Sequence, residues 1–257
     1  SSGKLADVIG YVSVADLEKL GRDGGLIPLN DLIKKYAPNI QKRLDTVPSF
    51  ASTAYSLDGN IYFIPKDQTL KFSEFYWIRT DWLEKLGLKV PTTVDELYTV
   101  LSAFRNKDPN GNGKKDEIPL AGSIIGWNDQ VERFLMNSFI YCDLDTNTAA
   151  GAEGNTGYMM NGKKADTAVN KPAFREGLKY INKLYNEGLI YKGSFTQDSS
   201  QLTQLVESAA QPVVGFAAGG WRGQFSSLSG ERFLHFQAIA PLKGPKGVRE
   251  AVNFLSV

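Results

Sequence analysis

The sequence has very little cysteine and histidine. Cys142 is its one cysteine and His235 its one histidine in 257 residues. A disulfide framework and a cysteine-based metal site are therefore excluded. His235 lies in an apolar stretch, Phe233-Leu-His-Phe236, which favours a position in or beside a strand over a catalytic role.

Net charge and long apolar runs are also lacking. The chain carries 29 basic and 28 acidic residues, a net charge of +1, so no bulk field favours nucleic acid or an anionic membrane, and we expect no nucleic-acid partner. No run of about eighteen apolar residues occurs that would span a bilayer. A Gly-x-Ser-x-Gly elbow is absent, and the Gly157–Lys163 match to a phosphate loop has Lys164 where Ser or Thr is required. Nothing in the sequence requires an enzyme.

A ten-residue stretch rich in oxygen-bearing side chains is the most informative feature that is present. It reads Asp108-Pro-Asn110-Gly-Asn112-Gly-Lys114-Lys-Asp116-Glu117. Donors at every second residue, the backbone carbonyl of Lys114 among them, and glycines between them are typical of a loop around calcium. The glutamate expected at position twelve is replaced by Pro119, so Glu117 must close the site. The sequence predicts a structural calcium ion here, and an Asn/Gly-rich solvated turn is the alternative.

Strand-like and helix-like segments alternate along the chain. Strands are expected at 7–11, 60–64, 74–78, 118–125, 212–218, 236–241 and 251–257, and a hairpin at 158–165. Helices are expected at 14–20, 28–36 and 201–206 and from Phe174 to Gly188. Three more helices are expected to start at a capping side chain, Asp81 for the helix to Gly87, Thr93 for the next, and Asp129 for the helix to Phe139. This alternation predicts an α/β fold.

Several segments, taken in order, resemble one known family. They include Gly25-Leu-Ile-Pro-Leu-Asn-Asp31, Asp58-Gly-Asn-Ile-Tyr-Phe-Ile-Pro65, the stretch 78–120 and Pro241-Leu-Lys-Gly-Pro245. These resemble the extracellular solute-binding proteins of bacterial ABC importers, in the sugar-binding family that includes maltose-binding protein and large Gram-positive lipoproteins. The resemblance implies the two-lobe, type II periplasmic-binding-protein fold, with ligand bound between the lobes.

The resemblance also implies a domain division. We expect an N-terminal lobe in residues 1–76, a C-terminal lobe with the calcium loop in 77–238, and a return crossover in 239–257. The family's signal peptide, lipid-modified cysteine and first strand–helix unit precede the position of Asp7, so we expect a first lobe that is incomplete in this chain.

The resemblance further implies ligand contacts. Trp221, in Gly219-Gly-Trp-Arg-Gly223, falls where the family has a tryptophan that stacks on sugar, and a tryptophan among glycines after a strand is placed for a loop. Trp127, Asn128 and Tyr11 match aromatic contact regions, with simple packing as the alternative. Lys66 and Asp67, after Pro65, are predicted to bind hydroxyls. Trp77 and Trp82 are predicted to pack in the core, and Tyr76 to face either side.

The resemblance implies binding without catalysis: a sugar or oligosaccharide is captured for import by permease subunits in the membrane. We expect a monomer, outside the cytoplasm and lipid-anchored to the outer face of the cell membrane. Two alternatives remain open, a secreted calcium-stabilised glycoside hydrolase and a binder of peptide or acidic polysaccharide. An acidic ligand should demand clustered basic residues near Trp221, where Arg222 alone is adjacent.

Overall fold

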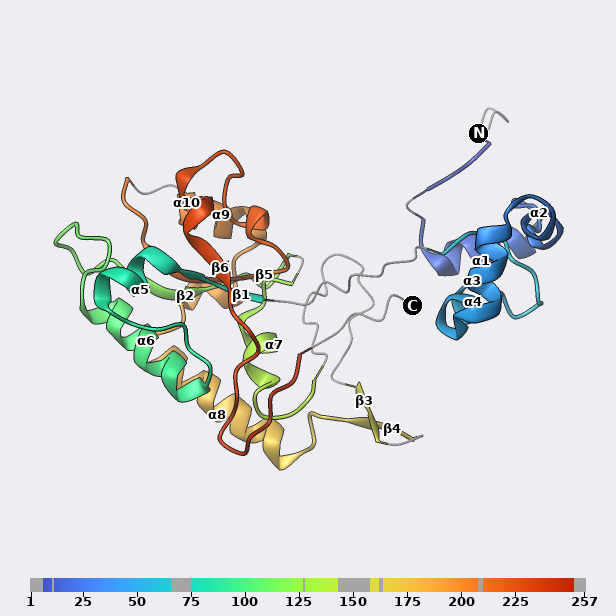
Figure 1. Ribbon diagram of the computed structural model, residues 1–257. Coiled ribbons are helices and arrows are strands. Elements are labelled where there is room, and N and C mark those ends of the chain that lie inside the picture. Colours follow the sequence, from blue (N-terminus) through green and yellow to red (C-terminus); the bar gives the residue numbers. More distant parts are fainter. Residues whose placement is uncertain are drawn as a thin grey trace. The chain divides into compact units, whose positions relative to one another are not determined.

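The computed structural model describes residues 7–10, 12–65, 75–126, 128–142, 158–161, 164–207 and 210–251, with the backbone alone for 158–161. Contacts divide the chain into two compact units, Ser1–Lys71 with Leu255–Val257, and Phe72–Phe254 (Figure 1). Each unit has a hydrophobic core of its own. None of the described helices is both long enough and apolar enough to cross a membrane.

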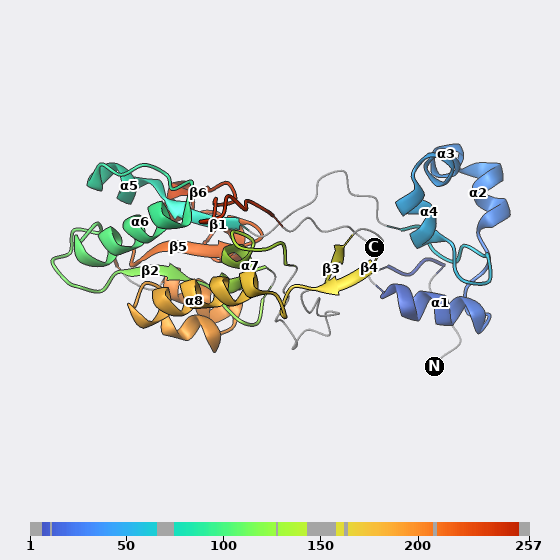
Figure 2. The same ribbon diagram turned by 90° about the horizontal axis from the view of Figure 1, so that it is seen from below.

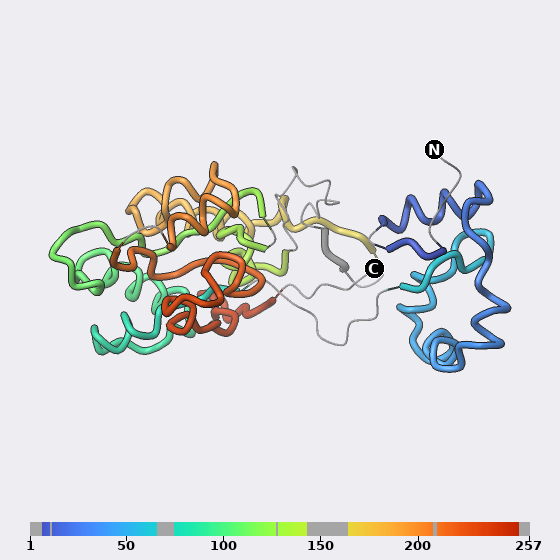
Figure 3. Tube along the Cα trace, turned by 90° about the horizontal axis from the view of Figure 1, so that it is seen from above, coloured from blue at the N-terminus to red at the C-terminus, as the bar shows by residue number. Residues whose placement is uncertain are grey.

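The described part of the first unit is helical. Its helices are α1 (Val14–Arg22), α2 (Asn30–Tyr36), α3 (Pro38–Thr46) and α4 (Pro48–Ala54), drawn in blue shades in Figure 3. The Ser13 side chain caps α1, and prolines begin α3 and α4, where a missing N–H costs nothing. The core consists of the buried residues Ile33, Leu44, Phe50, Ala54 and Ile61.

The second unit is built on a four-stranded mixed sheet. Its order is β2 (Ile118–Ala121), β5 (Val214–Gly219), β1 (Phe75–Arg79) and β6 (Phe236–Ala238). β2 and β5 are parallel, whereas β1 runs antiparallel to β5 and β6. A separate hairpin pairs β3 (Tyr158–Asn161) with β4 (Lys164–Thr167). Because β2 and β5 run the same way, the loops that follow them emerge at the same edge of the sheet.

Helices cover both faces of this sheet (Figure 1). One face packs on α5 (Thr80–Leu86), α6 (Val94–Asn106), α7 (Val131–Met136) and α8 (Pro172–Asn186) (Figure 2). The other face packs on α9 (Ser199–Glu207), near the short helices η2 (Arg222–Gln224) and α10 (Glu231–His235). A further 3-10 helix, η1, spans Lys192–Phe195. Both faces of β5 are consequently buried along its whole length.

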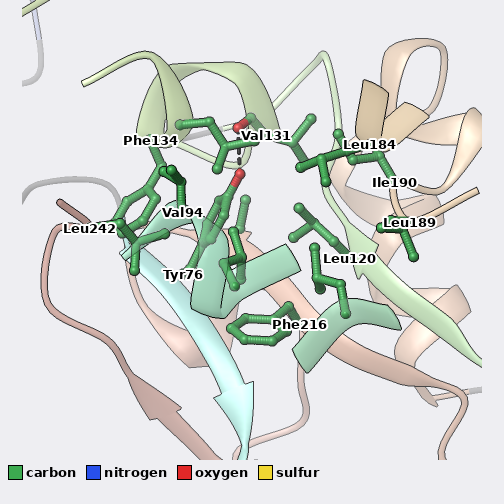
Figure 4. Packing of buried hydrophobic residues seen from close by; sticks show 14 of the residues in the cluster. Tyr76, Val94, Leu120, Val131, Phe134, Leu184, Leu189, Ile190, Phe216 and Leu242 are labelled. Carbon is green, nitrogen blue, oxygen red and sulfur yellow. Dashed lines mark hydrogen bonds between the residues drawn. The ribbon is translucent and has the colours of Figure 1, made fainter. Parts of the chain in front are cut away.

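Alternation along β1 decides where its aromatic residues lie. Tyr76 is fully buried in the larger core, and its hydroxyl donates to the carbonyl of Val131 at 2.5 Å (Figure 4). Trp77 faces the opposite side, partly buried, and its indole N–H donates to the carbonyl of Gly219 at 2.9 Å. Trp82 is 1% exposed and meets Phe104 edge to face. Trp77 and Trp82 therefore pack in the protein, as expected, and Tyr76 faces the core.

Two predicted strands of the first unit are wrong. Residues 7–10 form no strand, and the 60–64 segment forms a single bridge, Ile61 with Tyr55. The apolar run 61–64 packs instead against helices, with Ile61 in the helical core. The predicted strand at 251–257 lies outside the described residues except for Ala251.

Two predicted helix caps are also wrong, because their carboxylates have other partners. Asp81 lies in the first turn of α5 and pairs with the Arg79 guanidinium at 2.6 Å. Asp129 precedes α7, whose N-cap is Gln130, and Asp129 accepts from the Ser123 hydroxyl instead. By contrast, Thr93 caps α6 as predicted, with its oxygen accepting from the Glu96 N–H.

Candidate functional site

The loop between α6 and β2 is organised around the carboxylate of Asp108. This residue has a left-handed backbone, φ 47°, and accepts N–H groups from Gly111 at 2.9 Å, Asn112 at 3.1 Å and Gly113 at 3.1 Å. Gly111 and Gly113 have φ values of 74° and 75°, where a side chain would be strained. The glycines therefore allow the tight turn that the sequence predicts.

Two amides in the same loop converge on Asp116. The side-chain nitrogens of Asn110 and Asn112 donate to its carboxylate, at 3.0 Å and at 3.1 and 3.0 Å. These hydrogen bonds, Asn110 first, and the charge of Lys114 lower the pKa of Asp116. The oxygens of the same two amides accept the backbone N–H groups of Asn112 and Lys114, so the side chains are already gathered on one centre.

Glu117 completes the predicted set with one unpaired carboxylate oxygen. Its Oε1 atom is buried and has no hydrogen-bond partner among the described residues. Burial raises the pKa of Glu117, and the charges of Asp108 and Asp116 raise it further. An unpaired buried oxygen among like charges is costly unless a cation is near, so the residues fit a hard metal ion.

The donor set determines what kind of metal the loop would hold. Over the part of the chain that the structure describes, no group of three or more His, Cys, Asp or Glu side chains is placed to bind a metal by itself. The fit therefore depends on amide and carbonyl oxygens as well, which suit calcium rather than zinc or copper. Lys85 of α5 steadies the loop from outside, donating to the carbonyl of Pro109 at 2.8 Å.

The second candidate region lies at the carboxyl ends of β2 and β5. The loop after β2, residues 122–130, closes on itself because Ser123 N–H donates to the carbonyl of Asp129 at 2.8 Å. A Cβ added at Gly122 would lie 2.3 Å from that carbonyl oxygen, and one at Gly126 would lie 2.1 Å from a carboxylate oxygen of Asp129. Both positions therefore need glycine, because a side chain there would collide with Asp129.

Asn128 is fixed in this loop in a left-handed conformation, φ 60°, which asparagine tolerates better than most residues. Its side-chain oxygen accepts from Arg133 at 2.8 Å, and its amide nitrogen is buried without a partner among the described residues. The oxygen is therefore used within the protein, whereas the amide nitrogen keeps its capacity to donate.

Asp129 is the residue of this region that the sequence analysis missed as part of the site. It is fully buried, accepts from the Ser123 hydroxyl at 2.6 Å, and its Oδ1 atom has no hydrogen-bond partner within the described part of the chain. Burial raises its pKa to about 6, against a smaller lowering from Ser123 and from the nearby side chain of Gln224. Gln224 belongs to η2, so Asp129 links the loop after β2 to the loop after β5. Polar residues in succession between Gly126 and an apolar helix were the available signal.

Trp221 stands in the loop after β5 with 45% of its surface exposed. It is the N-cap of η2, and its carbonyl accepts the N–H of Gln224 at 3.1 Å. Gly220 N–H donates to the side-chain oxygen of the same Gln224 at 3.3 Å. The indole is thus held on an ordered turn and is open to solvent, unlike Trp77 and Trp82.

Arg222, the basic neighbour of Trp221, is engaged elsewhere. Its guanidinium lies 4.0 Å from the ring centre of Phe233 and donates to the carbonyls of Phe233 and Phe236 at 3.4 and 3.2 Å. It also lines an open hollow of about 470 Å³ together with Trp77, Thr80, Leu234, Phe236, Gln237 and Ala238. Its charge therefore serves the packing of α10 on the sheet.

The structure thus brings two predicted ligand residues, Asn128 and Trp221, to loops that Asp129 and Gln224 connect. Four other predicted contacts, Tyr11, Lys66, Asp67 and Trp127, lie outside the described residues. All six predicted calcium ligands fall in one described loop. In that loop the backbone N–H of Lys114 donates to the side-chain oxygen of Asn112 at 2.7 Å.

Comparison with known proteins finds relatives of one kind. Residues 1–247 match the model of the bacterial extracellular solute-binding protein family. The fructooligosaccharide ABC transporter substrate-binding protein FusA of Streptococcus pneumoniae is 37% identical over 208 residues, 77% of this chain and 37% of FusA. Lipoprotein LipO of Bacillus subtilis is 30% identical over 201 residues, 76% of this chain and 37% of LipO.

Solved structures agree with this match. FusA in complex with kestose has a TM-score of 0.71 at 32% identity, covering 95% of this chain and 48% of the solved chain. A FusA EF-hand mutant in complex with fructo-nystose has a TM-score of 0.70 at 30% identity, over the same 95% and 48%. The alginate-binding protein AlgQ2 without calcium ion has a TM-score of 0.64 at 30% identity, covering 92% of this chain and 46% of AlgQ2.

The chain spans less than half the length of each of these relatives. Over that span, the predicted α/β fold of a periplasmic-type solute-binding protein is confirmed. The chain belongs to the bacterial extracellular solute-binding protein family.

Proposed function

We propose that this chain is part of the extracytoplasmic substrate-binding component of an ABC importer, and that its ligand is a neutral sugar or oligosaccharide. The observation that carries the proposal is the exposed indole of Trp221 at the carboxyl end of β5, beside a loop with buried, unpaired polar atoms. Ligands of α/β proteins bind outside the carboxyl ends of strands, where loops supply such groups.

Binding would combine stacking with a few directed hydrogen bonds. An exposed indole offers an apolar face to the C–H face of a pyranose or furanose ring, and water leaves both surfaces. The Asn128 amide can donate to a hydroxyl and Asp129 Oδ1 can accept from one, which would satisfy both buried atoms. Tyr11, Trp127, Lys66 and Asp67 remain predicted contacts of the same ligand.

A neutral ligand is favoured over an acidic polysaccharide by the state of Arg222. Its guanidinium is committed to the Phe233 ring and to two carbonyls. An acidic ligand would need a free cation close to the indole. AlgQ2 is named for alginate, so an acidic oligosaccharide stays in the test below as the competing ligand.

We also propose that the loop 108–117 binds a structural calcium ion through Asp108, Asn110, Asn112, the Lys114 carbonyl, Asp116 and Glu117. The unpaired Oε1 atom of Glu117 and its raised pKa support this assignment. One solved FusA is named as an EF-hand mutant, and the solved AlgQ2 is described as without calcium ion, which supports it as well. The ion would join the end of α6 to the start of β2, and it would take no part in ligand binding by the loops that follow β2 and β5.

The proposed partner is a membrane permease, reached from outside the cytoplasm. The family description is extracellular, FusA is named as an ABC transporter component and LipO as a lipoprotein. We therefore propose a monomeric protein anchored by lipid to the outer face of the cell membrane, which binds its ligand and does not transform it.

Titration calorimetry on the full-length protein tests this function. Kestose is the first probe, followed by neutral gluco-oligosaccharides, a uronic-acid oligosaccharide and a peptide mixture. We expect saturable binding of a neutral sugar by the native protein and at least about tenfold weaker binding by Trp221→Ala. Chromatography of the sugar after overnight incubation separates binding from hydrolysis. Full affinity in the variant would mean that Trp221 is not part of the binding site. Released monosaccharide would mean that the protein is a glycoside hydrolase.

A further inference from the structure

Gly223 lies two residues after Trp221, at the middle of η2. A Cβ added there would lie 2.4 Å from Cη2 and Cζ3 of the Trp221 indole and 2.9 Å from Cδ2 of Leu228. Real Cβ atoms do not approach other carbons so closely, because van der Waals contact between carbons begins near about 3.5 Å. The six-membered ring of the indole therefore rests on the bare backbone of Gly223, in contact with the place that a methyl group would fill.

The backbone at this position does not itself need glycine. Gly223 does not have a positive φ, unlike the described residues Gly87, Gly111, Gly113 and Gly188. An alanine would suit the dihedral angles of the 3-10 turn, so space, not conformation, is what glycine provides at residue 223.

The backbone around Trp221 is fixed independently of its side chain. Trp221 itself is extended, φ −158° and ψ 154°, its carbonyl accepts from Gln224, and Gly220 is tied to the Gln224 side chain. Since the main chain is held on both sides, the two side-chain torsions alone decide where the indole lies. The atoms that Gly223 leaves room for are the far end of this exposed ring and of Leu228, which is 64% exposed. Both can swing outward without disturbing the core.

The same arrangement occurs once more in the second unit, in η1. A Cβ on Gly193 would lie 2.4 Å from Cε1 of Tyr191, the N-cap residue of that turn. Tyr191, however, is partly buried and packs against the smaller core of the sheet. The two turns therefore share a local geometry, with the aromatic ring turned to the core in one and to solvent in the other, and provide a matched pair.

We propose that Gly223 is a positioning residue for the ligand, because its bare backbone seats the Trp221 indole against Leu228 and leaves one indole face ready for a sugar ring. The assignment rests on the proposed function. A platform held in its binding orientation before the ligand arrives loses less freedom on binding, and this raises affinity.

The test compares Gly223→Ala with Gly193→Ala in the full-length protein. The ligand-free readout is the indole N–H resonance of Trp221 in a ¹⁵N spectrum, assigned by its loss in Trp221→Ala. We expect Gly223→Ala to shift this resonance and to leave the melting temperature almost unchanged. The affinity for kestose, or for the sugar of the panel that binds most tightly, should fall about 3- to 10-fold. Gly193→Ala should lower the melting temperature and leave affinity near that of the native protein.

The double variant shows whether the effect passes through the indole. In a Trp221→Ala background, Gly223→Ala should cause no further loss of affinity, since the ring it displaces is gone. An unshifted Trp221 resonance, unchanged affinity, equal losses from Gly223→Ala and Gly193→Ala, or an undiminished loss in the double variant would each overturn the assignment. If no sugar binds the native protein, the proposed function fails by itself, and the resonance alone then decides whether Gly223 seats the ring.

Discussion

The calcium loop and the two ligand loops of the second unit hold polar groups in opposite ways. In residues 108–117 most polar groups satisfy one another: three N–H groups donate to Asp108 and two amides donate to Asp116, and Glu117 Oε1 is left without a partner among the described residues. In the loops after β2 and β5, Asn128 and Asp129 each keep a buried atom without a partner, and the link to Gln224 spans almost a hundred residues of sequence.

The difference matches the work proposed for each region. A loop that closes on itself and needs one ion to neutralise Glu117 can stabilise the fold permanently. Loops that leave buried donors and acceptors unpaired carry a cost that a ligand removes, so their energy is available for binding. We therefore expect metal and ligand to act on separate measurable quantities, stability and affinity.

Removal of calcium should produce the largest effect, and it tests most directly whether the loop 108–117 acts on stability and not on affinity. With ion at about a thousand times its dissociation constant, the metal contributes about 4 kcal/mol to the free energy of unfolding. For a protein of this size that corresponds to a fall in melting temperature of roughly 10 °C on chelation. Calorimetry with EGTA, then with added calcium or magnesium, measures it, while sugar affinity should change less than about twofold. An unchanged melting temperature would contradict the assignment of a structural metal ion to this loop.

Glu117→Gln should weaken calcium binding next most strongly, on the order of 10- to 100-fold, because one of three carboxylate charges is lost from the site. The raised pKa of Glu117 adds a pH dependence. Since the ion must displace a proton that the buried carboxyl holds more tightly than usual, calcium affinity of the native protein should fall as the pH is lowered, and fall less in the variant. Calcium titration at several pH values tests both. Glu84→Gln, an exposed change on α5, is the control and should have no effect.

The turn at 108–117 could be predicted because its information is local. The spacing of the donors and the glycines at the turns follow from neighbouring residues, and the structure keeps them within one loop, whereas the role of Glu117 as a calcium ligand stays a prediction. Thr93 as a cap and Gly188 after α8 were readable for the same reason. Local rules failed where tertiary partners decide. Residues 60–64, a short apolar run ended by Pro65, look like a strand but pack on helices.

The ligand region could be predicted only in part. The glycines around Trp221 indicated an exposed loop, and its solvent-open indole agrees with that expectation. Asp129 looked like a helix cap. Ser123 contacts it within the same loop, but the approach of Gln224 depends on the parallel pairing of β2 with β5. That pairing joins segments far apart in the chain, and no spacing rule shows which side chains it brings together.

Trp221→Ala should separate affinity from stability in the opposite sense to chelation. Loss of the stacking surface should weaken sugar binding about 10- to 30-fold, whereas an exposed side chain removed from the surface should change the free energy of unfolding by less than about 1 kcal/mol. Trp82→Ala is the matched control. It empties a buried, 1% exposed position and should cost roughly 3–5 kcal/mol of stability. Isothermal titration and thermal unfolding of both variants measure the contrast, and a large loss of stability in Trp221→Ala would contradict it.

Asp129→Asn should change stability by an amount that depends on pH. Burial raises the pKa of Asp129 to about 6 from an ordinary 3.8, so between these values the folded protein binds more protons than the unfolded chain. Stability of the native protein therefore falls as the pH rises through about 4 to 6, and the whole cost is present at pH 7. Asparagine removes the buried charge, so the variant should gain up to about 3 kcal/mol relative to the native protein as the pH rises from 4 to 7. Ser123→Ala, which removes the donor to the charged form, should do the reverse and destabilise more at pH 7 than at pH 4. Thermal unfolding of the three proteins across this range measures the difference, and parallel curves would mean that Asp129 is not held as a buried acid between the two loops.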